Sequence, residues 1–217
     1  MASSAKTDRQ LSIRSNEFLW DGADDPGAFS YLLPPIIETL HHARARAVLD
    51  LGCGNGALAS HLAAAGYEVT GCDHSASGVE LAQRNVPSSS FFRQDLSADL
   101  PAGHCAAYDA VVSTEVIEHL LLPRRLLENA RAALRPGGIF LVTTPYHGYW
   151  KNLALALTNK FDEHWHPLRD YGHVKFFSRQ TLTQLFDEAG FKRILSTTAG
   201  RIPPLARSLV VSGVKAS

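Results

Sequence analysis

Two glutamates and a histidine occur close together in an otherwise apolar stretch, Ser113–Leu122, which reads STEVIEHLLL. If a helix begins there, Glu115 lies one turn from both Glu118 and His119, and the three side chains share a face. Two carboxylates and an imidazole that converge can hold a divalent cation such as Mg²⁺, Mn²⁺ or Zn²⁺. They can equally provide a general base, contact a substrate without a metal, or be helix-end polar groups with only a structural role.

A second group of residues suits a ligand that carries a ribose. The sequence VLDLGCGNG places Asp50 in an apolar strand, followed by Gly52, Gly54 and Gly56. Glycines let the backbone turn sharply and approach a ligand, while the next helix offers unpaired amide groups. Asp73 ends the second strand, where a carboxylate can accept hydrogen bonds from ribose hydroxyls. The same spacing also satisfies the dinucleotide-site pattern, so a nicotinamide dehydrogenase stays open at this point.

Apolar runs and turn residues predict the elements that position both groups. Strands are expected over Ala47–Gly52, Tyr67–Asp73, Ser90–Gln94, Tyr108–Thr114 and Ile139–Pro145, then from about Phe191 and near Arg207–Val214. Helices are expected over Gly56–Gly66, Ala76–Asn85, Pro123–Leu134 and Arg179–Ala189, the last capped by Ser178. This alternation is typical of an α/β protein with a doubly wound, mostly parallel sheet and helices on both faces. Ligands bind such sheets at the carboxyl ends of the strands.

Three further features narrow the ligand. Asp95 follows the third strand, and LRPGG (Leu134–Gly138) predicts a tight turn into the fifth. The short connection between the last two strands predicts a hairpin, with the final strand antiparallel. Together with DLGCGNG, these features resemble the class I S-adenosylmethionine-dependent methyltransferases, from Val48 to the C-terminus. The resemblance implies a Rossmann-like, seven-stranded sheet in a single domain over 1–217, and S-adenosyl-L-methionine as cofactor with S-adenosyl-L-homocysteine as product.

The resemblance also assigns cofactor contacts. Gly52, Gly54 and Gly56 would pack against the methionine portion, Asp73 would hold the ribose and Asp95 would contact the adenine. Asp50, Thr114 and Tyr31 complete the set of candidate cofactor-binding residues.

EVIEH and the later HVKF, which contains His173, resemble two branches of this superfamily. One is the ubiquinone-biosynthesis-type O-methyltransferases. The other is the small-RNA 3′-terminal 2′-O-methyltransferases, in which two glutamates and two histidines bind a metal. Carried over, the candidate metal ligands are Glu115, Glu118, His119 and His173, and the candidate catalytic residues are Glu118, His119 and His173. The implied activity is O-methylation of a small-molecule hydroxyl, with an RNA ribose as the alternative acceptor.

Charge and composition limit the partners. Lysine plus arginine equal aspartate plus glutamate at 21 each, so no net positive charge attracts DNA or RNA. The absence of a long apolar run and the polar N-terminus argue against membrane insertion and a secretory signal. Cys53, Cys72 and Cys105 have no metal-type spacing. We therefore expect a cytoplasmic monomer or homodimer that acts on a small molecule.

Two segments fall outside the strand–helix alternation: an N-terminal cap over residues 1–45 and a lid insertion over 146–172. Both are rich in aromatic residues, which predict a rim for an apolar or aromatic acceptor or simply pack the segments onto the sheet. These aromatics are Phe18, Trp20, Phe29, Tyr31, Tyr146, Tyr149, Trp150, Phe161 and Trp165. Trp150–Phe161 has an apolar side with lysines near each end, for which packing in the core is favoured over contact with a membrane.

Overall fold

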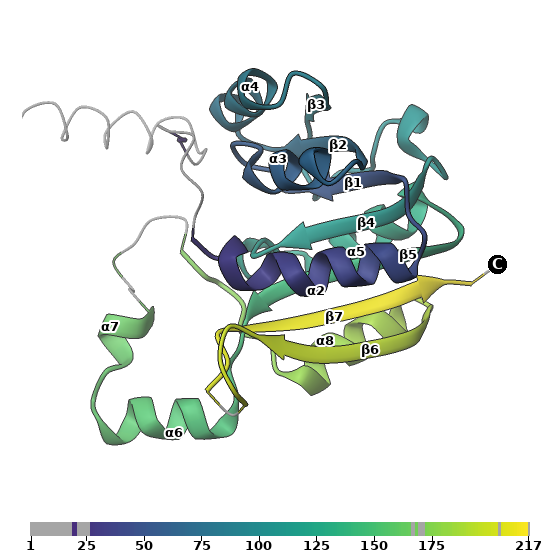
Figure 1. The fold of residues 1–217 in the computed structure, drawn as a ribbon. Coiled ribbons are helices and arrows are strands. Elements are labelled where there is room, and N and C mark those ends of the chain that lie inside the picture. The colour runs from purple at the N-terminus through teal and green to yellow at the C-terminus, as the bar shows by residue number, and fades with distance from the viewer. Residues whose placement is uncertain (1–18, 21–26, 166–167, 169–171, 204, 217) are drawn as a thin grey trace, which may run out of the picture.

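The computed structural model describes residues 19–20, 27–165, 168, 172–203 and 205–216 (Figure 1). Phe18, predicted as part of the aromatic rim, lies outside them. At the centre is a seven-stranded sheet with the order β3-β2-β1-β4-β5-β7-β6. The strands are β1 (Ala47–Leu51), β2 (Glu68–Asp73), β3 (Ser90–Arg93), β4 (Tyr108–Thr114), β5 (Leu134–Pro145), β6 (Phe191–Ala199) and β7 (Ser208–Lys215).

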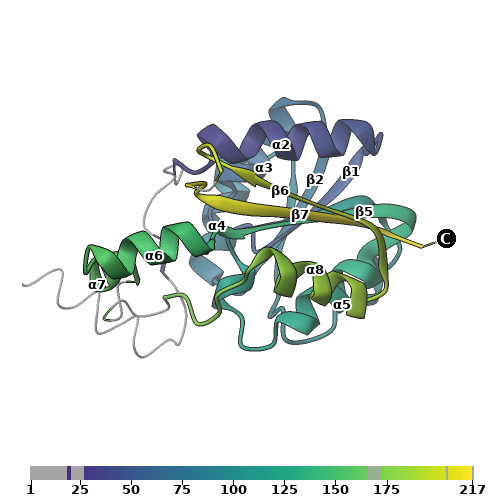
Figure 2. The ribbon, with the colours of Figure 1, turned by 90° about the horizontal axis from the view of Figure 1, so that it is seen from below.

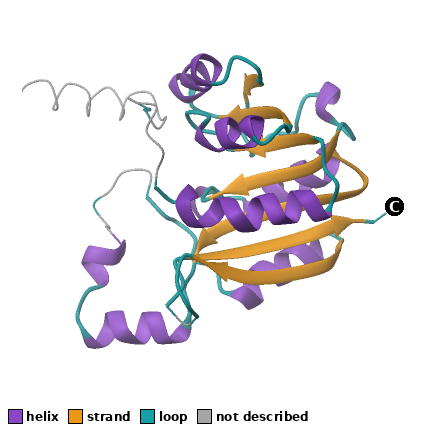
Figure 3. Ribbon diagram, in the orientation of Figure 1, coloured by secondary structure: helices purple, strands orange, loops and turns teal. Residues whose placement is uncertain are grey.

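The pairing of the strands confirms the predicted topology. β1 pairs in parallel with β2 and β4, β2 with β3, and β4 with β5. The last strand, β7, inserts antiparallel between β5 and β6. The carboxyl ends of β1 to β6 therefore meet at one edge of the sheet, and the start of β7 joins them there (Figure 3).

Helices cover both faces of the sheet because its strands are apolar on both sides (Figure 2). In β4, Val111 packs with one core cluster while its neighbours Ala110 and Val112 pack with the other. The first cluster includes buried residues of α5 (Pro123–Ala133) and α8 (Arg179–Glu188). The second includes those of α2 (Phe29–His42), α3 (Ala57–Ala64) and α4 (Ala76–Asn85). The predicted cap Ser178 is confirmed, since its hydroxyl accepts a hydrogen bond from the Thr181 amide.

Three local expectations do not hold. Leu134–Gly138 does not form a separate turn: β5 already begins at Leu134, which pairs with Tyr108, and the pairing resumes at Ala110 and Ile139 across a bulge. EVIEH does not begin an α-helix, because Glu115 has a left-handed backbone (φ 54°) and only a 3₁₀ turn, η2 (Ile117–His119), follows. A second 3₁₀ turn, η1 (Ala102–His104), precedes β4.

The third concerns α6 (Tyr149–Leu157), which does not pack in the core. Tyr149, Trp150 and Leu157 are 72%, 60% and 79% exposed. With α7 (Phe161–Trp165), it stands away from the sheet, beyond the carboxyl ends of the strands (Figures 1 and 2). Among the described residues, no helix has the length and apolar character that a membrane crossing requires.

The predicted N-terminal cap contains a core helix. Leu32, Ile36 and Leu40 lie on one side of α2 at helical spacing and are fully buried. Phe29 is also buried and packs beside His61, so it belongs to the core and does not line a rim. α2 therefore holds Tyr31, which lies in its first turn, at the carboxyl edge of the sheet.

Candidate active site

The loop between β1 and α3 has the conformation that its glycines allow. Gly52, Gly54 and Gly56 have φ values of 88°, 50° and 82°, in the region that other residues rarely adopt. The amides of Gly52 and Cys53 both donate to the carbonyl oxygen of Cys72, at 2.8 and 2.9 Å, which fixes the loop against the end of β2. A Cβ atom at Gly52 would lie 2.5 Å from Val116. The loop can thus pass this close to the segment after β4 only with glycine at that position.

Asp73, at the end of β2, connects this loop to α4. One carboxylate oxygen accepts from the Gly54 amide at 2.9 Å, and the other accepts from the Ser75 amide at 2.8 Å. Ser75 in turn caps α4 by accepting from the Gly78 amide. Burial raises the pKa of Asp73, and the amide hydrogen bonds act against that shift. Asp73 therefore stabilises the loop, in addition to its predicted role in binding a ribose.

Asp50 is fully buried in β1, and neither of its carboxylate oxygens has a hydrogen-bond partner among the described residues. Burial, and then the charge of Asp73, raise its pKa to about 8. A buried polar group without a partner is costly, so such groups are rare unless they serve a ligand. The carboxyl group of Asp50 next to the glycine loop fits a ligand that donates hydrogen bonds, as the amino group of S-adenosylmethionine does.

The other predicted cofactor residues lie around the same edge. Asp95 is exposed in the loop after β3, and the amide of Ser97 donates to its carboxylate at 2.8 Å and lowers its pKa. Thr114 is the last residue of β4 and pairs with Thr143 of β5. The Tyr31 hydroxyl lies 3.5 Å from the Ser208 hydroxyl, at the start of β7. Thr114 and Tyr31 thus belong to the half of the edge formed by β4, β5 and β7.

Trp20 lies against the glycine loop. The sequence predicted it as part of the aromatic rim around the acceptor and did not predict this contact. Its amide donates to the Ser77 hydroxyl at 3.1 Å. The indole is so close to Gly54 and Gly78 that a Cβ atom at either would lie within 3 Å of it. The sequence signal for this contact is the pair of glycines, one in the loop and one in the first turn of α4, that leave room for a flat ring.

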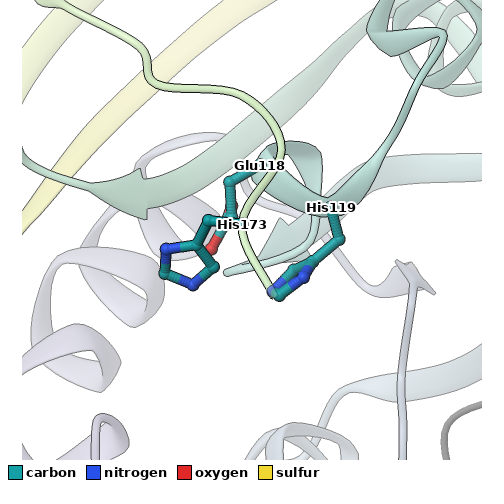
Figure 4. Close-up of side chains that lie close together, drawn as sticks. All are labelled: Glu118, His119 and His173. Atoms are coloured by element: carbon teal, nitrogen blue, oxygen red, sulfur yellow. The ribbon is translucent and has the colours of Figure 1, made fainter. Parts of the chain in front are cut away.

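Glu118, His119 and His173 come together beyond the end of β4 (Figure 4). One ligand atom from each lies within 4.8 Å of the other two. Glu118 is buried and its Oε2 accepts from the Thr144 hydroxyl at 3.0 Å, whereas both histidines are exposed. The two imidazole rings meet edge to face with centroids 4.8 Å apart.

Backbone hydrogen bonds bring His173 to this position. The carbonyl oxygen of Glu118 accepts from the amides of Val174 and Lys175, both at 2.9 Å. The Nδ1 atom of His119 lies 3.2 Å from the carbonyl oxygen of Gly172. Because a carbonyl oxygen only accepts, this bond requires the proton on Nδ1 and places the lone pair of a neutral ring on Nε2.

Glu115 does not join the other three candidate ligands. The left-handed turn at Glu115 directs it elsewhere: its Oε1 accepts from the Thr143 hydroxyl at 2.9 Å. Burial raises its pKa, while hydrogen bonds from Thr143 and Ser208 act in the opposite direction. The pKa of Glu118 is raised to about 8, first by burial and then by the charge of Glu115. The carboxylates of Glu115 and Glu118 are therefore close enough to influence one another, but they have different hydrogen-bond partners.

A family model described as a methyltransferase domain matches residues 27–196, from the start of α2 into β6. The chain belongs to this methyltransferase family. Its relatives include proteins named ubiquinone biosynthesis O-methyltransferase. The one from Methylobacterium nodulans is 30% identical over 74% of this chain and 65% of its own length, and the one from Coxiella burnetii is 26% identical over 84% and 80%. The match thus spans slightly less than two thirds of the first of these relatives.

Solved structures share the fold of the methyltransferase. The S-adenosylmethionine-dependent methyltransferase SibL superimposes with a TM-score of 0.67, at 24% identity, over 85% of this chain and 54% of that one. The methyltransferase domain of the bacterial protein CtHen1-CN superimposes with a TM-score of 0.64, at 22% identity, over 84% and 96%. The chain thus contains a methyltransferase domain, and the glycine loop, Asp50 and Asp73 fit the S-adenosylmethionine that the sequence resemblance implies.

Proposed function

We propose that the methyltransferase transfers the methyl group to a hydroxyl of a small molecule, and that Glu118, His119 and His173 act on this acceptor. The observation that carries the proposal is the convergence of the three side chains within 4.8 Å of one another. β1 and β4 are parallel neighbours, so the residues that follow β4 lie next to the glycine loop that follows β1. The three side chains are thus adjacent to the expected cofactor site.

The residues on the β1 and β2 side would hold the cofactor. Gly52, Gly54 and Gly56 would admit it close to the backbone, Asp50 would accept from its amino group, and Asp73 and Asp95 would hold its nucleoside. When bound, S-adenosylmethionine supplies a sulfonium methyl group that a nucleophile in line with it can displace. The remaining task of the protein is to align the acceptor and to remove its proton.

His119 is suited to receive that proton. Its Nδ1–H donates to the Gly172 carbonyl, so the lone pair of the neutral ring is on Nε2. The backbone bonds of Glu118 to Val174 and Lys175 keep His173 beside it. General base catalysis by a positioned imidazole typically contributes about 10²–10⁴-fold to the rate.

The same three side chains suit a divalent cation. One carboxylate oxygen and two imidazole nitrogens are ligands that Mn²⁺ and Zn²⁺ accept, and three protein ligands leave positions for a substrate. Held there, a cation would lower the pKa of an acceptor hydroxyl. Glu118 would bind as the carboxylate, so a cation would also reverse the upward shift of its pKa.

Two observations favour a small molecule over an RNA. The formal net charge is zero, and the named relatives act in ubiquinone biosynthesis, as their names state. A ribose hydroxyl of an RNA end remains the alternative acceptor, suggested by the resemblance of EVIEH and HVKF to that branch.

The test is methyl transfer from labelled S-adenosylmethionine to a panel of catechols and to a short RNA with a free 3′ end. We expect O-methylated catechol from the wild-type enzyme. Glu118→Gln, His119→Ala and His173→Ala should each lower kcat by roughly 10²-fold or more. His42→Ala, at the exposed end of α2, is the matched control and should keep full activity. Intact turnover in the Glu118→Gln/His119→Ala double variant would refute the proposed role of the three residues.

A titration of metal-free enzyme with Mn²⁺ separates the two roles. Heat of binding that His173→Ala abolishes would identify a metal site. A silent titration with full activity after chelation would identify His119 as a base that acts without metal.

A further inference from the structure

Three basic residues lie where β5 and β6 end and β7 begins. Lys151 is in the first turn of α6, Arg207 directly precedes β7, and Arg201 lies in the connection between β6 and β7. The Nζ atom of Lys151 donates to the Tyr146 carbonyl at 3.0 Å, and the Tyr146 amide donates to the Arg207 carbonyl at 2.8 Å. The segment after β5 and the start of β7 are thereby held together.

Arg207 also links this group to the wall of the site. Its guanidinium lies 5.5 Å from the centre of the Tyr31 ring, as in a cation–π contact. The Tyr31 hydroxyl lies near that of Ser208, and hydrogen bonds from Ser208 and Thr143 reach Glu115. The basic group therefore lies beside Tyr31, which is next to Ser208 and, through it, to Glu115.

Lys151, Arg201 and Arg207 differ in their surroundings from the arginines elsewhere in the protein that have acidic partners. Arg124 pairs with Glu188 at 2.7 Å, Arg125 pairs with Asp99 at 2.6 Å, and Arg135 pairs with Asp109. By contrast, in the part of the chain that the structure describes, Lys151, Arg201 and Arg207 form no ion pair. Glu115 acts on Lys151 only as a charge at longer range.

Lys151 is half-buried, which makes an unpaired charge at this position unfavourable. Burial lowers the pKa of Lys151, the charge of Glu115 acts against this shift, and the positive charge of Arg201 adds to it. The effects of burial and of Arg201 would be offset by an anionic group placed against the ammonium.

We propose that Lys151, with Arg207 and Arg201 beside it, binds a carboxylate carried by the methyl acceptor. This inference rests on the proposed function, because it assigns a chemical class to the acceptor of the same site. The position in the sheet favours the acceptor over the methionine carboxylate of the cofactor. The glycine loop and Asp73 follow β1 and β2, whereas the three cations follow β5, β6 and precede β7, on the other side of β4.

The experiment compares two probes of similar size, 3,4-dihydroxybenzoate and its neutral analogue 3,4-dihydroxybenzamide. Their affinities for enzyme saturated with S-adenosylhomocysteine are measured by calorimetry, and their methylation is measured separately. We expect the wild-type enzyme to bind the benzoate roughly tenfold more tightly, as a partly desolvated ion pair allows. Lys151→Met should abolish this preference, and Lys151→Arg should retain most of it.

Lys160→Met is the matched control, since Lys160 is an exposed lysine between α6 and α7, and it should behave as the wild type. Equal or undetectable binding of the two probes by the wild-type enzyme overturns the proposal. So does a loss of affinity for S-adenosylhomocysteine in Lys151→Met, because the cations would then serve the cofactor. Thermal melting of each variant verifies that it is folded.

The two proposals fail separately. A Lys151-dependent preference for the benzoate without methylation of either probe would retain the anion site and refute catechol O-methylation. Equal methylation of both probes, unchanged in Lys151→Met, would retain O-methylation and refute the anion site.

Discussion

At the scale of single residues, the site depends on carboxyl groups that are shielded from water and differ in their hydrogen-bond partners. Glu118 accepts a hydrogen bond from Thr144, Glu115 accepts one from Thr143, and Asp50 has no described partner. Burial raises the pKa of each, most clearly for Asp50 and Glu118. Without ligands such groups destabilise the fold, as is common in sites that are organised for binding.

Asp50→Asn should make the cofactor-free enzyme more stable, and increasingly so at higher pH. The folded state keeps the Asp50 proton up to about pH 8, whereas the unfolded chain releases it near its ordinary value of 3.8. The stability of the wild-type enzyme therefore falls as pH rises between these values. The difference between variant and wild type should grow by up to about 1.4 kcal/mol per pH unit in urea unfolding at pH 5 to 8.

Asp109→Asn is the control for this series. Asp109 pairs with Arg135 and has a lowered pKa, so it is ionised in both states over that range. Its stability difference from the wild type should not change between pH 5 and 8. Parallel curves for Asp50→Asn and the wild type would contradict the raised pKa.

Trp20→Ala should weaken binding of S-adenosylhomocysteine by roughly tenfold, about 1.4 kcal/mol. The indole covers Gly54 and Gly78, so its removal exposes the loop that is expected to hold the cofactor. Calorimetry of the variant measures the loss. Trp150→Ala, which removes an exposed tryptophan from α6, should bind as the wild type does, and equal affinities in both variants would exclude Trp20 from the site.

At the scale of secondary-structure elements, the packing of α3 against α4 explains the third glycine of the loop. Gly56 precedes α3 with a left-handed backbone, and a Cβ atom there would lie 2.9 Å from both Cα and Cβ of Ala82 in α4. The helices can approach this closely only without a side chain at that point. The glycine loop is therefore required by the fold as well as by a ligand.

Gly56→Ala should destabilise the protein by roughly 2–5 kcal/mol, from backbone strain together with overpacking. Gly66→Ala provides a matched comparison, because Gly66 has a similar φ of 91° but no atom within 4 Å of an added Cβ. Only strain remains there, at about 1–2 kcal/mol. The free energies of unfolding of the two variants measure the difference, and equal losses would exclude the contact with Ala82.

At the scale of the whole molecule, one edge of the sheet is divided between two tasks. The ends of β1 and β2 hold the groups that fit the cofactor, and the ends of β4 and β5 with the start of β7 hold those proposed to meet the acceptor. α6 and α7 lie between β5 and α8 in the chain and extend from this same edge of the sheet (Figure 1). His147, after β5, is stacked with Trp165 of α7 at 4.7 Å and lies 5.4 Å from the ring of Phe176, which joins these helices to the segment that carries His173.

S-adenosylhomocysteine at 100 times its dissociation constant should stabilise the folded enzyme by about 2.7 kcal/mol. For a chain of this length, that corresponds to a rise in Tm of roughly 5–10 °C. NAD at the same concentration should give no shift. A rise in Tm with NAD and none with S-adenosylhomocysteine would contradict the assignment of the cofactor. The thermal melt therefore tests which cofactor binds at this edge of the sheet.

The sequence by itself determined the strands of the sheet, most of the helices that cover it, and the positions of the glycine loop and Asp73. Apolar periodicity placed Ala76–Asn85 and Tyr108–Thr114 at their observed bounds, because such patterns follow from local backbone geometry. The glycine loop and Asp73 were also predictable, since the end of a strand and the turn after it are contiguous in the chain.

Only the tertiary structure decided which residues meet. The left-handed turn at Glu115 separates it from Glu118 and His119, against the helical spacing, and Glu118 holds the distant His173 segment by backbone hydrogen bonds. Trp20 and Phe29 are both aromatic residues of the N-terminal segment, but Trp20 lies on the glycine loop whereas Phe29 lies in the core. Lys151, Arg201 and Arg207 converge because β7 inserts antiparallel beside β5. Each of these contacts joins segments far apart in the chain, and local sequence patterns contain no information about such distances.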